Sequence, residues 1–125
     1  MSKSVQEKNF HILSFKYAWQ GILDALRQEP NLKFHLLAAF LVMLLSFILK
    51  ISPSDWIKVI ILIGLVISLE LTNTAIEVVV DAFIDAQHPG AKLAKDISAG
   101  AVLVTAITAT VAGLMIFLPY ILAYG

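Results

Sequence analysis

Three long stretches of the chain are apolar, and most polar residues lie in the segments between them. Residues 34–49 are apolar except for His35 and Ser46, residues 59–69 carry no polar side chain but Ser68, and residues 97–124 contain no charge. About 20 apolar residues cross a bilayer as a helix. The pattern therefore predicts an all-α integral membrane protein. The predicted membrane helices are residues 31–50, 54–84 and 93–123.

The second predicted helix is longer than a membrane requires. Its apolar part is short for a span, but no Pro or Gly interrupts the chain between Leu65 and Gln87. We therefore expect one helix that continues through Glu70 and leaves the hydrocarbon as it passes Glu77. Ser54 or Asp55 is expected to cap its beginning.

Two further features concern the last predicted helix. Pro89-Gly90 is a turn signal, so residues 85–92 are predicted to form a loop. Small side chains on the last helix would let neighbouring helices approach closely. These small residues are Ala99, Gly100, Ala109 and Gly113.

Residues 9–28 show the periodicity of an amphipathic helix. One stripe is apolar and rich in aromatic side chains, and it consists of Ile12, Phe15, Trp19, Ile22 and Leu26. The opposite stripe consists of Lys16, Gln20, Asp24 and Arg27. This pattern predicts an N-terminal helix lying in the membrane interface, with a helix packed on a soluble core as the alternative. Pro30 disfavours helical geometry at Glu29 and is suited to start the next helix.

Composition and charge agree with a small membrane protein. The chain has 125 residues, enough for a single domain (1–125), with 59% hydrophobic and 14% charged residues. Soluble domains are about half apolar and a quarter charged. A net charge of zero argues against nucleic acid as a partner. The lack of cysteine excludes disulfides, thiol nucleophiles and cysteine-based zinc sites.

The distribution of basic residues predicts the orientation in the membrane. Five basic residues precede the first span, and they are Lys3, Lys8, Lys16, Arg27 and Lys33. Lys92 and Lys95 lie between the second and third spans, whereas the first turn has Lys50 and Lys58 and the C-terminus has none. The positive-inside rule then places the N-terminus and the 82–97 loop in the cytoplasm.

A stripe of polar residues follows the second apolar run. Relative to Glu70, Asn73 lies at about −60°, Glu77 at about −20° and Asp81 at about +20° around a helix. With the predicted orientation, the cytoplasmic end of the membrane also carries Glu29 before the first span and Lys95-Asp96 before the third.

Such a cluster of acids suits several kinds of chemistry. Two or three carboxylates can hold a hydrated Mg²⁺ whose other ligands are phosphates, and Lys95 can contact a phosphate. A carboxylate near the hydrocarbon can act as a base toward an alcohol. These parts fit phosphoryl transfer to a lipid hydroxyl, although neither a P-loop nor a protein-kinase motif is present. Ion or proton transport, and simple pairing with Lys92, Lys95 or Arg27, remain alternatives.

The segments ELTNTAIEVVVDAF and HPGAKLAKDISAGAVLV closely resemble the prokaryotic diacylglycerol kinase family of small membrane lipid kinases. The family stretch E-x-x-N-[ST]-A-I-E-x-x-V-D is matched by Glu70, Asn73, Thr74, Ala75, Ile76, Glu77, Val80 and Asp81, and its A-K-D by Ala94, Lys95 and Asp96. The resemblance implies a homotrimer in the cell membrane, with sites between protomers near the cytoplasmic surface. It also implies MgATP as the phosphate donor.

The resemblance further implies roles for individual residues. Glu70 would be the general base toward the lipid hydroxyl, and Asn73 would support the site. Glu29 and Glu77 would hold Mg²⁺ and thereby the nucleotide. The other implied nucleotide contacts are Tyr17, His88, Lys95 and Asp96, and the implied lipid contacts besides Glu70 are Trp19 and Ala99. A role for Asp81 stays open.

The family has a branch that acts on diacylglycerol and a branch associated with undecaprenol. NTAIE, HP after the second span, N-x-x-F-H at 31–35 and FLP near the end resemble the second branch. His35 stands where the diacylglycerol branch carries an acid. Phe10 stands where that branch places an arginine near the nucleotide, which leaves Lys16 or His11 as substitutes. We therefore expect an undecaprenol kinase, with diacylglycerol kinase as the alternative and a small acid-bearing transporter subunit as a more distant one.

Overall fold

The computed structural model describes the backbone of residues 3–124 and the side chains of residues 14–123. Within that range the chain is entirely helical, in four helices. They are α1 (Lys3–Gln28), α2 (Pro30–Leu49), α3 (Pro53–Phe83) and α4 (Pro89–Tyr124). Three of them, α2, α3 and α4, are long and apolar enough to cross a membrane, so the predicted all-α membrane architecture is confirmed.

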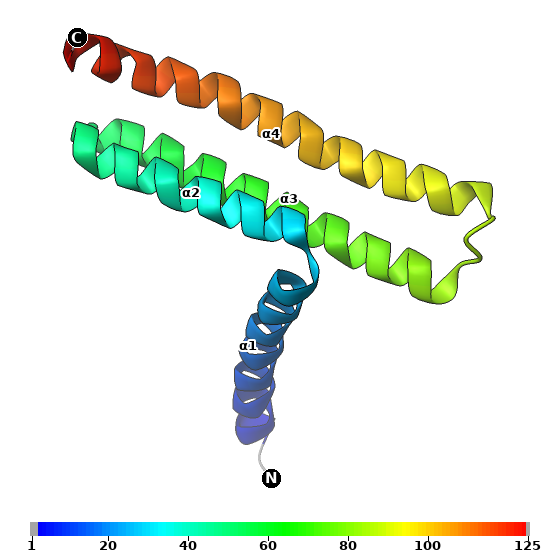
Figure 1. Ribbon diagram of the computed structural model, residues 1–125. Coiled ribbons are helices and arrows are strands. Elements are labelled where there is room, and N and C mark those ends of the chain that lie inside the picture. Colours follow the sequence, from blue (N-terminus) through cyan, green and yellow to red (C-terminus); the bar gives the residue numbers. More distant parts are fainter. Residues whose placement is uncertain (1–2, 125) are drawn as a thin grey trace.

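The lengths of the three membrane helices differ, and this difference positions the site. The 20 residues of α2 extend about 30 Å, the thickness of a hydrocarbon core. The 31 residues of α3 extend about 46 Å and the 36 residues of α4 about 54 Å. All three helices are aligned at the end where α2 meets α3, so the extra length of α3 and α4 projects past the start of α2 (Figure 1).

The turn between α2 and α3 contains two helix caps. Lys50 ends α2 in the left-handed region (φ 52°), and its N–H bonds to carbonyl groups of the last turn. Ser52 begins α3, because its hydroxyl accepts a hydrogen bond from the Asp55 N–H at 3.2 Å. Pro53 occupies the first helical position, where no N–H is needed. The prediction that Ser54 or Asp55 caps α3 was therefore wrong by two or three residues.

The helix α1 meets the bundle at one corner. It leaves the bundle steeply from the start of α2 (Figure 1). A single extended residue, Glu29 (φ −110°, ψ 107°), separates the two helices, and Pro30 is the first residue of α2. Phe15, Trp19 and Ile22 from the predicted apolar stripe are exposed. The side chain of Ile12, also in this stripe, lies outside the described side chains, and an interfacial position of α1 stays a prediction.

The connection between α3 and α4 is shorter than the sequence indicates. Residues 85–92 were predicted to be a loop, but α4 already begins at Pro89. His88 stabilises this beginning, because its Nδ1 accepts a hydrogen bond from the Gly90 N–H at 2.9 Å. A Cβ atom added at Gly90 would lie 3.0 Å from the His88 ring, so a glycine accommodates this contact. The Pro-Gly pair thus starts a helix here.

The buried core is small and lies at the end of the bundle opposite the α1 corner. It consists of Ile51, Val59 and Phe117, with partly buried apolar neighbours. Most large apolar side chains point outward, as a lipid environment requires. Small residues of α4 were predicted to let neighbouring helices approach closely. Within this chain no helix does so at Gly100 or Gly113, because a Cβ atom added at either position would meet nothing within 4 Å.

Tyr120 ties the end of α4 to the turn between α2 and α3. Its hydroxyl donates to Asp55 Oδ2 at 2.6 Å and accepts a hydrogen bond from the Ser52 N–H at 2.9 Å. Asp55 is also paired with Lys58 at 3.2 Å. Because this cluster links residues 65 or more positions apart, we expect it to stabilise the bundle.

We predict that Tyr120→Phe lowers the midpoint of thermal unfolding in detergent by roughly 4–8 °C, because it removes both bonds of the hydroxyl. Thr108→Val is the matched control, since the Thr108 hydroxyl bonds only to the Val104 carbonyl of its own helix turn. Equal midpoints for the two variants would show that the Tyr120 cluster does not hold the bundle together.

Candidate catalytic site at the corner of α1 and α2

Glu70 is a buried carboxylate in the middle of α3. Its side chain is only 2% exposed, and its Oε2 lies 3.5 Å from the Nε2 atom of His35 on α2. Glu77 shares the face of α3 that carries Glu70, and Glu29 is the residue before α2. His35 belongs to the second turn of α2, so the Glu70–His35 pair lies within about two turns of an expected edge of the hydrocarbon. The structure therefore places Glu70 and Glu29 at the same end of α2.

Asn73 is held by hydrogen bonds on both sides of its amide. Its Nδ2 donates to Glu77 Oε1 at 3.3 Å, and its Oδ1 accepts from the Ser98 hydroxyl of α4 at 2.8 Å. Both Asn73 and Ser98 are buried. Ser98 thus joins the Asn73 position of the predicted polar stripe on α3 to α4.

Ser98 was not identified from the sequence. A signal was present, because Ser98 follows Lys95 by three residues and residues at this spacing share a helix face. If Lys95 faces the acids of α3, Ser98 does too.

The ends of α3 and α4 carry a second group of charges. Lys95 Nζ pairs with Asp81 Oδ1 at 2.8 Å, and Lys92 pairs with Asp96 at 2.6 Å. These four side chains line a surface pocket of about 410 Å³. Asp81, whose role the sequence left open, is the acid that holds Lys95. Asp81 and Glu77 lie four residues apart on one face of α3, so this group of charges continues the polar stripe.

Several residues of the predicted site remain apart from the acids in the single chain. Tyr17 and Trp19 lie on α1 and are 68% and 58% exposed. His88 and Ala99 are also exposed, at the start of α4 and farther along it. The side chains of Phe10 and His11 lie outside the described part of the chain.

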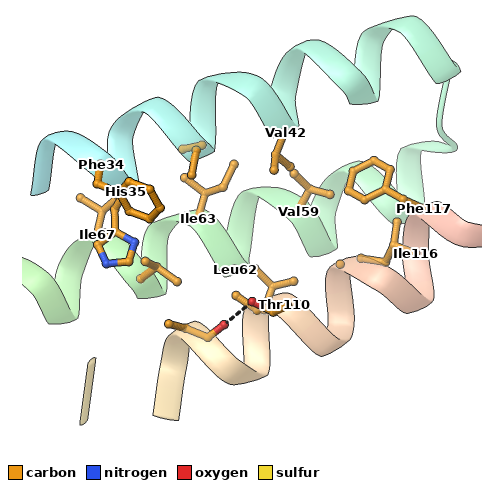
Figure 2. A pocket seen from close by; sticks show the side chains of 16 residues that line it. Phe34, His35, Val42, Val59, Leu62, Ile63, Ile67, Thr110, Ile116 and Phe117 are labelled. Atoms are coloured by element: carbon orange, nitrogen blue, oxygen red, sulfur yellow. Dashed lines mark hydrogen bonds between the residues drawn. The ribbon is translucent and has the colours of Figure 1, made fainter. Parts of the chain in front are cut away.

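An apolar pocket adjoins the site on its membrane side. Its volume is about 340 Å³, and it lies between α2, α3 and α4. Figure 2 shows His35 beside Ile67 at one end of this pocket and Phe117 beside Ile116 at the other. His35 therefore borders both the buried carboxylate and an apolar space.

The acids are compatible with Mg²⁺ bound through a phosphate. Among the described side chains, no three His, Asp or Glu groups converge as a complete metal site. Mg²⁺ does not need one, because it usually takes one or two carboxylates and completes its shell with water and phosphate oxygens. Glu29 and Glu77 are half-buried carboxylates near Glu70 and supply this type of donor.

Comparison with known proteins identifies the family. The family model described as "Prokaryotic diacylglycerol kinase" matches residues 16–117 of this chain. The chain belongs to this family. It is 46% identical to the undecaprenol kinase of Bacillus subtilis (strain 168) over 113 residues, which are 90% of this chain and 92% of that protein. It is 36% identical to the diacylglycerol kinase of Synechocystis sp. over 113 residues, 90% of this chain and 65% of that protein. The predicted membership is confirmed.

Because Ser98 fixes the Asn73 amide, Ser98→Ala should lower the kinase activity by about 3- to 10-fold, the effect of one hydrogen bond. Ser98→Thr should retain most activity, because it keeps the hydroxyl. Thr105→Ala is the control on the same helix, since the Thr105 hydroxyl bonds only to the Ala101 carbonyl of its own helix. Full activity of Ser98→Ala in a phosphate-transfer assay would refute a positioning role for this serine.

Proposed function

We propose that this protein is a membrane lipid kinase that transfers the γ-phosphate of ATP to undecaprenol. The observation that carries the proposal is a 2% exposed glutamate, Glu70, at the membrane edge with two more acids near it. The lipid assignment is supported by the similarity to a protein named undecaprenol kinase, with 46% identity. Phosphatidic acid formation from diacylglycerol is the alternative, since a second relative is named diacylglycerol kinase.

In this proposal Glu70 is the general base. It accepts the hydroxyl proton of a lipid alcohol bound at this end of the bundle as the lipid oxygen attacks the γ-phosphorus. Burial keeps water away from the base and favours the lipid as acceptor. Asn73 holds Glu77 in place through its amide, as the hydrogen bonds on both sides of Asn73 indicate.

Glu29 and Glu77 would hold Mg²⁺, which when bound neutralises phosphate charge. Lys95 would contact the phosphates, and it has to exchange its bond with Asp81 for one with the nucleotide. Asp96, His88 and Tyr17 are proposed to lie against the nucleotide. The pocket between the ends of α3 and α4 supports the placement of Lys95 and Asp96, which both line it.

The remaining features of the proposal concern assembly and orientation. We propose a homotrimer, because Tyr17, Trp19 and Ala99 are exposed in one chain and a neighbouring protomer would bring them to a shared site. We also propose that α1 lies in the membrane interface, and that the N-terminus and the site face the cytoplasm. The basic residues before α2 and at the start of α4 support this orientation.

The substrate is tested by transfer of radiolabelled γ-phosphate from MgATP in detergent micelles, with undecaprenol and diacylglycerol offered separately. We expect strong labelling of undecaprenol. We expect Glu70→Gln to lose about 10²- to 10⁴-fold in turnover, the usual contribution of a general base, while it keeps MgATP binding. Preferred labelling of diacylglycerol would overturn the assignment of undecaprenol as the substrate. Transport of ions or protons by the protein, without labelling of either lipid, would overturn the proposal that it is a kinase.

The metal assignment makes a separate prediction. Glu29→Gln and Glu77→Gln should each raise the Mg²⁺ concentration needed for half-maximal activity, because each removes a charged ligand. Asp24→Asn is the control, since Asp24 is an acid on α1 that interacts locally with Gln20 and Arg27. Unchanged Mg²⁺ titrations for both glutamate variants would contradict the assignment.

A further inference from the structure

The proposed mechanism leaves open where the proton goes after Glu70 has accepted it. Glu70 is 2% exposed and cannot pass the proton directly to bulk water. A base that keeps its proton cannot act in the next turnover. The site therefore needs a neighbouring group that accepts the proton from Glu70.

His35 is in a position to accept this proton. Its Nε2 atom lies 3.5 Å from Glu70 Oε2, and its side chain is 18% exposed. The other charged groups acting on Glu70 are both acids, Glu29 at the α1 corner and Glu77 on α3. The basic Lys95 of α4 is paired with Asp81. Imidazole is also the side chain that changes protonation near neutral pH.

The surroundings of His35 favour this role over simple packing. The α2 residue Phe34 contacts the imidazole edge-on, with ring centroids 5.7 Å apart. On the other side the ring borders the apolar pocket, whose α4 wall is uncharged and includes Ala106, Ala109 and Thr110 (Figure 2). The imidazole of His35 is thus surrounded by apolar groups on its other sides, and these groups hold it next to the Glu70 carboxylate.

We infer that His35 is a positioning residue for Glu70 that receives the substrate proton from it in each turnover. The lipid O–H bond breaks as its oxygen bonds to the γ-phosphorus, and the proton moves to Glu70 Oε2. It then moves to the Nε2 atom of a neutral His35. The imidazolium pairs with the restored carboxylate until it releases a proton to water. This inference rests on the proposed function, with Glu70 as base.

The test compares wild type, His35→Gln and His35→Ala in the phosphate-transfer assay across pH. In wild type, kcat should fall as the pH is lowered, because a protonated His35 cannot accept the proton from Glu70. His35→Gln should lower kcat by about 10-fold or more, leave KM for ATP unchanged and change the pH at which kcat falls. Added imidazole should restore part of the kcat of His35→Ala.

Two controls separate the proton role from a structural one. Ser46→Ala changes another buried polar residue of α2, whose hydroxyl bonds to the Val42 carbonyl of its own helix, and should keep the wild-type pH profile. In a Glu70→Gln background, His35→Gln should cause no further loss, because both residues act in one step. Protection of each variant by MgATP against thermal unfolding verifies that it is folded.

The outcomes distinguish the two levels of the proposal. A wild-type protein that labels no lipid alcohol overturns the proposed function, and the role of His35 with it. If wild type is active and depends on Glu70, an unchanged pH dependence of kcat in folded His35→Gln, or no rescue of His35→Ala by imidazole, overturns the role of His35 alone.

Discussion

The site depends on the length of α2. A helix of 20 residues is about as long as the hydrocarbon core is thick. Its first residue therefore marks one expected edge of the hydrocarbon. The longer α3 continues past this edge, and its Glu70 lies beside His35 in the second turn of α2. A carboxylate buried much deeper would be costly to ionise, and one farther out would not meet a lipid hydroxyl. The different lengths of the two helices thus place a buried carboxylate, the proposed base, near the expected edge of the hydrocarbon.

The bundle is fixed more firmly at its two ends than along its sides. At one end the Tyr120 cluster joins α4 to the turn between α2 and α3. At the level of the site, Ser98 and Asn73 join α4 to α3. Between these points the chain leaves an apolar pocket and open space at Gly113. The polar bonds therefore determine how α4 lies against α3, since apolar contacts in lipid are not selective.

The sequence predicted the helices and the stripe of acids well, because both follow from spacing along one helix. Glu70, Asn73 and Glu77 share a face at any tilt of α3, and a break between the first two helices follows from Pro30. Contacts between helices were harder to predict. The hydrogen bond of Ser98 to Asn73 and the contact of His35 with Glu70 depend on how each helix is rotated, which no single-helix pattern fixes. Pro89 was misjudged because the same residue can end a turn or start a helix.

The joint between α1 and α2 has a mechanical consequence. Glu29 belongs to both helices, since its N–H bonds back to Ala25 at 2.9 Å and its carbonyl accepts from Lys33 at 3.4 Å. The direction of α1 is set by the two backbone dihedral angles of this one residue. A change in the angle between α1 and α2 therefore rotates the backbone that carries the Glu29 carboxylate. In this fold, the direction of α1 and the position of the Glu29 carboxylate depend on the same two dihedral angles.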